Sequence, residues 1–139
     1  DRIAAIVSLA GATFAKSADC RPSDAVAVLQ IHGTADATIA FTGGSIGGVP
    51  YPGAEETVAT WAGYDGCAAA ASSIDQRVDI DANLTDAGQP EETTIKRWTG
   101  CKPGGAAELW AIPGGSHVPT ISSAFGAAVL DFLEAHPKP

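Results

Sequence analysis

The sequence from Val26 to Asp36 reads VAVLQIHGTAD, and this stretch decides the fold. Its apolar, β-branched beginning predicts a strand that is buried on both faces, as the strands of parallel sheets are. The strand runs into Gly33, and the acidic residue Asp36 follows shortly after it. Functional side chains of α/β proteins stand beyond the carboxyl ends of such strands. We therefore expect an α/β fold with Asp36 at a functional edge of the sheet.

A second stretch near the C-terminus has the same design. Glu108–Ile112 predicts a strand, and the Gly-rich loop that follows it delivers His117. In a Ser-His-Asp triad, a His acts as general base toward a serine and a carboxylate holds the imidazole. Asp36 and His117 are therefore candidate catalytic residues. The alternative is a solvated turn Asp and a loop His that bonds to the backbone.

Three further segments have strand patterns. Residues Ile3–Ala10 predict another buried strand, and the alternation of polar and apolar residues in Gln76–Ile80 and Thr93–Trp98 predicts a half-exposed hairpin. With the two strands above and two helices, this order predicts a mostly parallel sheet with flanking helices. It is typical of the C-terminal part of one α/β domain, covering residues 1–139.

Two segments predict helices, and a Gly- and Pro-rich segment predicts an irregular loop. Apolar residues with helical spacing occur in Ala54–Ala62 and in Phe125–Leu133, where Ser122 or Ser123 could cap the second helix. Residues 42–53 are so rich in Gly and Pro that we expect a surface loop there.

Composition excludes several classes of partner. The net charge is −8 with only 8 Lys and Arg in 139 residues, which argues against binding to nucleic acid or to an anionic membrane surface. Apolar runs are only as long as strands, so no transmembrane helix is expected. The sequence has no dinucleotide fingerprint and no phosphate-binding loop, and we expect neither a cofactor nor a metal.

The three cysteines, Cys20, Cys67 and Cys101, show no C-x-x-C spacing. Cys67 follows a predicted helix and Cys101 precedes a predicted strand, and both lie in turns beside Gly. The residues therefore allow either a Cys67–Cys101 disulfide or two separate buried thiols. In the first case, Cys20 has no partner within the chain.

Several motifs of the chain occur together in one group of α/β-hydrolases. The chain resembles the secreted esterases related to feruloyl esterases, acetyl xylan esterases and polyhydroxybutyrate depolymerases. The resemblance covers nearly all of the sequence and includes an amphipathic closing helix. The motifs that carry it are His32–Asp36, a helix opened by Tyr51–Thr57 and ended by Gly66-Cys67, the segment Trp98–Cys101, and Gly114–His117.

The resemblance implies a secreted carboxylic-ester hydrolase that acts on a small-molecule or polymeric ester. It implies that Asp36 is the triad acid, that His117 is the triad base and that Cys67 pairs with Cys101. In such hydrolases the nucleophilic serine precedes the acid, on a G-x-S-x-G turn between a strand and a helix. The serine and the oxyanion hole would therefore belong to an N-terminal portion of the same enzyme, upstream of this chain, and this segment alone would be inactive.

Two other hypotheses stay open. A G-x-S-x-G pattern does occur at Gly43–Gly47, which makes Ser45 a candidate nucleophile of a small self-sufficient hydrolase, although no strand leads into it and it follows Asp36. The chain could also be a non-catalytic α/β binding module. In the esterase hypothesis, Tyr51 is the aromatic residue that we expect near a substrate.

Overall fold

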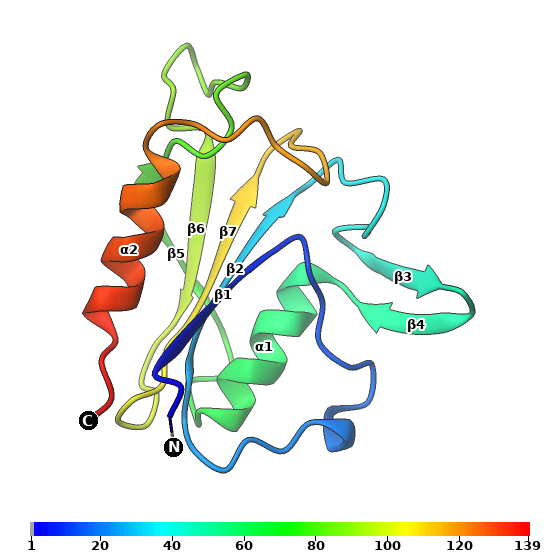
Figure 1. The fold of residues 1–139 in the computed structure, drawn as a ribbon, viewed down its shortest axis with the longest axis vertical. Helices are drawn as coiled ribbons and strands as arrows, with labels where there is room; N and C mark the ends of the chain where they lie inside the picture. Colours follow the sequence, from blue (N-terminus) through cyan, green and yellow to red (C-terminus); the bar gives the residue numbers. More distant parts are fainter. Residues whose placement is uncertain (1) are drawn as a thin grey trace.

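The computed structural model describes residues 2–139, so Asp1, with which the predicted domain begins, lies outside the described residues. A five-stranded sheet in the order β1-β2-β7-β6-β5 forms the centre of the molecule (Figure 1). Its strands are β1 (Ala5–Leu9), β2 (Ala27–Gly33), β5 (Ser72–Val78), β6 (Thr93–Trp98) and β7 (Ala107–Ile112).

The sheet is mixed rather than mostly parallel. β1, β2 and β7 are parallel, whereas β6 is antiparallel to β7 and β5 is antiparallel to β6. The α/β class is therefore confirmed, but the prediction of a mostly parallel sheet is wrong. The reason is that the predicted hairpin β5–β6 joins the main sheet, because the inward residues Ile74 and Ile95 pack into the same core as β2 and β7.

The two helices cover opposite faces of the sheet (Figure 1). Helix α2 (Phe125–Ala135) packs on the face that carries Leu29 and Ile31 of β2, and helix α1 (Ala54–Tyr64) packs on the other face. Because side chains alternate along a strand, Gln30 and His32 of the buried strand β2 point toward the face covered by α1.

Both predicted helices are present, with small differences at their ends. Glu55 and Glu56 lie in the first turn of α1, where acidic side chains favour the helix dipole, and Gly66, at φ +66°, follows its end. The residue that caps α2 is Ala124, not a serine, but Ser122 Oγ accepts a hydrogen bond from the Ala124 N–H at 3.1 Å.

The prediction of an irregular loop over residues 42–53 is wrong. This segment forms a two-stranded antiparallel ribbon of β3 (Gly43–Ile46) and β4 (Val49–Pro52). Gly47 and Gly48, at φ +57° and +82°, occupy the two central positions of its turn. A tight hairpin turn of type I′ requires positive φ at both positions, so the glycines that suggested an irregular loop are what permits the hairpin.

A disulfide joins Cys67 to Cys101, as the resemblance implied, and Cys20 is a free, partly buried thiol. The bond ties the end of α1 to the turn after β6. Disulfides form and persist in oxidising compartments, which is compatible with an extracellular protein. No helix within residues 2–139 has the length and apolar character needed to cross a membrane.

We expect the double variant Cys67→Ala/Cys101→Ala to unfold at lower denaturant concentration than the wild type. The disulfide spans 34 residues of sequence, and closing such a loop in the unfolded chain contributes about 3–4 kcal/mol. Equilibrium unfolding measures the loss. Cys20→Ala is the matched control because it removes a thiol without breaking a bond, and an equal loss in this control would contradict the prediction.

Candidate active site

The site is built where β2 and β7 end side by side. Gly33 is the register partner of Ile112, so the loops that follow the two strands start together. Backbone hydrogen bonds then join the loops, from Thr34 N to Ile112 O at 2.9 Å and from Ala35 N to Gly115 O at 2.9 Å. The Gly114 N–H donates to Thr34 Oγ1 at 2.8 Å. These contacts fix the Asp36 loop against the loop that carries His117.

The structure brings Asp36 and His117 together. His117 Nδ1 lies 2.9 Å from Asp36 Oδ2, although 81 residues separate the two in sequence. The Asp36 side chain is fully buried, whereas the His117 side chain is 36 % exposed. The alternative of a solvated turn Asp and a backbone-bonded His is therefore wrong. Because a carboxylate only accepts hydrogen bonds, Nδ1 carries the proton in this contact.

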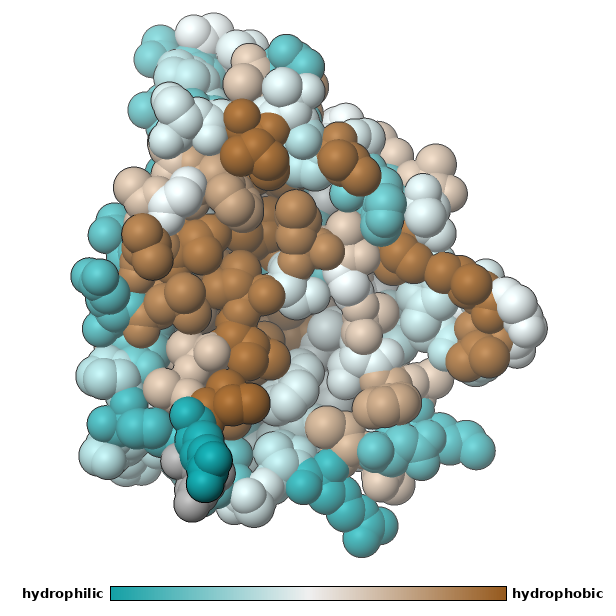
Figure 2. All heavy atoms as spheres, in the orientation of Figure 1, coloured by the Kyte–Doolittle hydropathy of each residue, from teal (hydrophilic) through white to brown (hydrophobic). Residues whose placement is uncertain are grey.

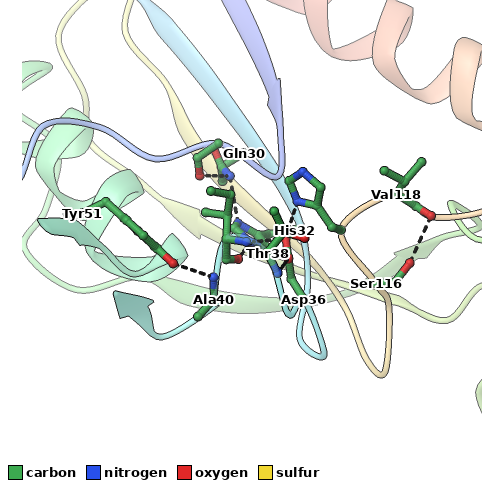
Figure 3. Close-up of polar contacts among 11 residues, drawn as sticks. Gln30, His32, Asp36, Thr38, Ala40, Tyr51, Ser116 and Val118 are labelled. Carbon is green, nitrogen blue, oxygen red and sulfur yellow. Dashed lines mark hydrogen bonds and ion pairs between the residues drawn. The ribbon is translucent and has the colours of Figure 1, made fainter. Parts of the chain in front are cut away.

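Asp36 is surrounded by donors (Figure 3). Its Oδ1 accepts from the N–H groups of Thr38 and Ile39 at 2.8 and 2.9 Å, and its Oδ2 lies 3.1 Å from His32 Nε2. Burial favours the neutral acid and raises the pKa of Asp36, but the hydrogen bonds from His117, Thr38 and Ile39 outweigh it, and the net pKa lies below 3.8. The site therefore keeps Asp36 as an anion.

His32 is the residue of this site that the sequence did not reveal. Its place at the end of a buried strand beside Gly33 favours a packed structural imidazole, and the residue is indeed buried, with 1 % of its surface exposed. It also contacts Asp36 on one side and Gln30 on the other, with 3.1 Å between Gln30 Nε2 and His32 Nδ1. The i, i+2 spacing of Gln30 and His32 on one face of a buried strand was the signal that could have found this pair.

His117 Nε2 makes no polar contact with any residue in the range 2–139. When Nδ1 is protonated, Nε2 of the neutral imidazole carries a lone pair, and it can take a proton from a hydroxyl placed against it. The neighbouring Ser116 does not fill this position, because its Oγ donates to Val118 O at 3.0 Å (Figure 3). The arrangement is thus an acid and a base without a nucleophile among the described residues.

Tyr51 lies in β4 beside the Asp36 loop and shapes it. The Tyr51 hydroxyl accepts a hydrogen bond from the Ala40 N–H at 2.9 Å (Figure 3). Tyr51 also lines an open groove of about 580 Å³ between the segment after β1 and the β3–β4 hairpin. The apolar side chains that line the groove with it include Phe14, Ile39, Ile46 and Val49.

Ser45 does not lie in a nucleophile turn. It is an exposed residue inside β3, where it pairs with Pro50 across the hairpin, and the turn after it leads into strand β4 rather than directly into a helix. No hydrogen bond joins Ser45 to Asp36 or to His117 within the described chain. The structural context that a G-x-S-x-G nucleophile requires, a strand that turns sharply into a helix, is missing at this position.

Comparisons with known proteins assign no family to the chain. No family model matches the chain, and no curated protein matches it in sequence. Within residues 2–139, no group of three or more His, Cys, Asp or Glu side chains is arranged to hold a metal ion. Function is therefore inferred from the geometry of Asp36 and His117.

We expect Gly33→Ala to separate the two loops of the site. A Cβ at position 33 would overlap the backbone of Gly115 and lie 2.6 Å from Ser116 O. Such overpacking costs about 1–3 kcal/mol, which equilibrium unfolding would measure. The control is Gly63→Ala in α1, where the added Cβ meets nothing within 4 Å. A loss of stability in the control as large as that in Gly33→Ala would contradict this interpretation.

Asp36 should contribute to stability in a pH-dependent way. Its pKa in the folded chain is lower than the ordinary value of 3.8, so the stabilisation is fully present above about pH 4 and is lost as the pH falls through the folded value. The difference in unfolding free energy between the wild type and Asp36→Asn should therefore shrink as the pH falls below 4. Urea unfolding at pH values from 2 to 7 measures it, and a difference independent of pH would contradict the expectation.

Proposed function

We propose that this chain is the acid–base part of a serine esterase of the α/β-hydrolase type, a carboxylic-ester hydrolase. The observation that carries the proposal is the contact of 2.9 Å between His117 Nδ1 and the buried Asp36 Oδ2. It joins two strand-end loops of the sheet and leaves Nε2 without a polar contact among residues 2–139. This is the arrangement that a Ser-His-Asp triad requires of its last two members.

The nucleophilic serine would come from a segment outside the described residues. This inference rests on His117, whose Nε2 no described serine contacts. Strand β1 lies at the sheet edge and pairs only with β2 among the described strands, so another strand could extend the sheet there. Apolar side chains gather over β1 and α2 (Figure 2), and Ile3, Leu9 and Leu130 are exposed. A preceding portion of the enzyme with the serine and the oxyanion hole would cover this surface.

In the proposed mechanism, His117 Nε2 takes the proton of the serine hydroxyl while the serine oxygen attacks the ester carbonyl. Asp36 holds the Nδ1–H and stabilises the imidazolium that forms. His117 then gives its proton to the leaving alkoxide, and the C–O bond to the alcohol breaks. In the second half, His117 takes a proton from water while the water oxygen attacks the acyl carbon. His117 then returns this proton to the serine oxygen as its bond to the acyl carbon breaks and the carboxylic acid leaves.

Two further features of the chain suit an ester substrate and an oxidising compartment. The groove beside Tyr51 is lined mainly by apolar side chains, which suit an uncharged acyl or alcohol group, and we assign Tyr51 to substrate binding within this proposal. The Cys67–Cys101 disulfide is compatible with secretion, which we include in the proposal. A non-catalytic module would not need a buried anion bonded to a half-exposed His, so the site supports the esterase over this alternative.

Labelling with a fluorophosphonate tests the proposal directly. The natural protein, purified from its source, is treated with the probe and analysed by intact mass and peptide mapping. We expect one labelled serine in a G-x-S-x-G peptide outside residues 2–139. Labelling of Ser45 would instead favour the small self-sufficient hydrolase, and no labelled serine together with no hydrolysis of 4-nitrophenyl acetate would reject the esterase.

We expect His117→Ala to lower kcat of the complete enzyme by about 10⁶-fold and Asp36→Asn by about 10⁴-fold, with KM little changed. The two losses differ because His117 moves the proton, whereas Asp36 holds the tautomer. Steady-state hydrolysis of 4-nitrophenyl acetate measures both values. His136→Ala, at the end of α2, is the control, and a comparable loss in this variant would contradict the assignment.

A further inference from the structure

We infer that His32 is a positioning residue, whose Nε2 bonds to Ile39 O and lies 3.1 Å from Asp36 Oδ2, and which so holds the turn and the carboxylate that orient His117. This inference rests on the proposed function, because Asp36 has a reaction to serve only if it is the acid of a triad. A chain of hydrogen bonds runs from the segment after β1, through Gln30 and His32 of β2 and then Ile39, to Asp36 and the His117 loop. No substrate contact is assigned to His32.

The neighbours of His32 determine its tautomer. Gln30 Nε2 donates to Gly11 O at 2.8 Å, and the same nitrogen lies 3.1 Å from His32 Nδ1. An amide nitrogen only donates, so Nδ1 is the acceptor and the ring proton lies on Nε2. His32 Nε2 is 2.8 Å from Ile39 O, which only accepts. The contacts of both ring nitrogens therefore indicate a neutral imidazole with its N–H at Nε2.

His32 Nε2 lies close to two oxygens. Its hydrogen bond goes to Ile39 O, and it lies 3.1 Å from Asp36 Oδ2, the same oxygen that accepts from His117 Nδ1. Oδ2 thus has an imidazole nitrogen on each side, one from a fully buried ring and one from a half-exposed ring. The buried ring cannot leave, because Gln30 holds its far side and the Phe41 ring packs edge-on against it with ring centroids 5.6 Å apart.

The place of His32 has a consequence for His117. The N–H groups of Thr38 and Ile39 fix Oδ1, and with it the rotation of the carboxylate about its Cβ–Cγ bond, as long as the turn that carries them stays in place. His32 bonds to Ile39 O and so ties this turn to strand β2. Oδ2 then stays in line with His117 Nδ1, and outer contacts of this kind typically change activity by about 10- to 100-fold.

Three variants of the complete enzyme test the inference. His32→Phe keeps the ring shape and the packing against Phe41 but removes the donor, whereas His32→Gln keeps an N–H near the position of Nε2. We expect His32→Phe to lower kcat for 4-nitrophenyl acetate by about 10- to 100-fold with KM unchanged. His32→Gln should keep most of the wild-type kcat. His136→Phe is the matched control, because the ring of His136 bonds to Phe132 O of the adjoining helix α2, and this variant should keep wild-type kcat.

The proton resonance of His117 Nδ1–H gives a second readout that does not depend on activity. In the wild type and in His32→Gln we expect a downfield NMR signal from the proton bonded to Asp36, and in His32→Phe we expect faster exchange with water or loss of the signal. Gln30→Leu should have a smaller effect in the same direction, since it frees the ring of His32 without touching Asp36. Thermal unfolding identifies any variant that does not fold. If His32→Phe does not fold, the kcat and the His117 signal of Gln30→Leu test the inference instead.

The outcomes separate the two proposals. If kcat and the His117 signal are the same in His32→Phe, His32→Gln and the wild type, His32 only fills space and the inference is wrong. If a serine is labelled and this result is obtained, the esterase stands while the role of His32 falls. If no serine is labelled, the esterase falls, and an unchanged His117 signal in His32→Phe would show separately that His32 does not hold Asp36.

Discussion

The parallel pairing of β2 with β7 is the constraint on which the site depends. It places Gly33 opposite Ile112, so Asp36 and His117 begin their loops at one edge although they are far apart in sequence. Both strands have hydrogen-bonded neighbours on each side, which prevents their register from slipping. A shift of one residue would turn Gln30 and His32 to the opposite face and bring their polar groups into the apolar core beneath α2.

The second condition is electrostatic, because Asp36 carries its charge inside the protein. An isolated buried carboxylate would take up a proton, but here backbone and side-chain donors compensate the burial. Two of the donors, the N–H groups of Thr38 and Ile39, belong to the turn that Asp36 itself begins. The loop therefore holds its acid before His117 contributes, as Asp side chains in such turns commonly do. His117 meets an anion that is already in place.

Local patterns in the sequence predicted the parts of the site, and nonlocal pairing decided the rest. The buried run before Gly33 and the strand before His117 identified both loop residues, because a strand ending is a local signal. Strands β5 and β6 join the sheet because β6 pairs with β7. No single segment of the sequence encodes such a pairing. Glycine content predicted irregularity at Gly47 and Gly48, although positive φ values there make a regular hairpin. His32 was missed because its contact with Asp36 depends on how the loop after Gly33 folds back.

The two nitrogens of His117 lie in opposite surroundings, and this asymmetry favours a chemical role. Nδ1 bonds to a buried anion, whereas the ring is 36 % exposed and Nε2 meets no polar group among residues 2–139. A histidine selected for stability alone gains most by packing its ring and satisfying both nitrogens, as His32 does at the same carboxylate. The two histidines beside Asp36 therefore differ in their surroundings. His32 satisfies both nitrogens within the protein, whereas Nε2 of His117 has no polar contact among residues 2–139.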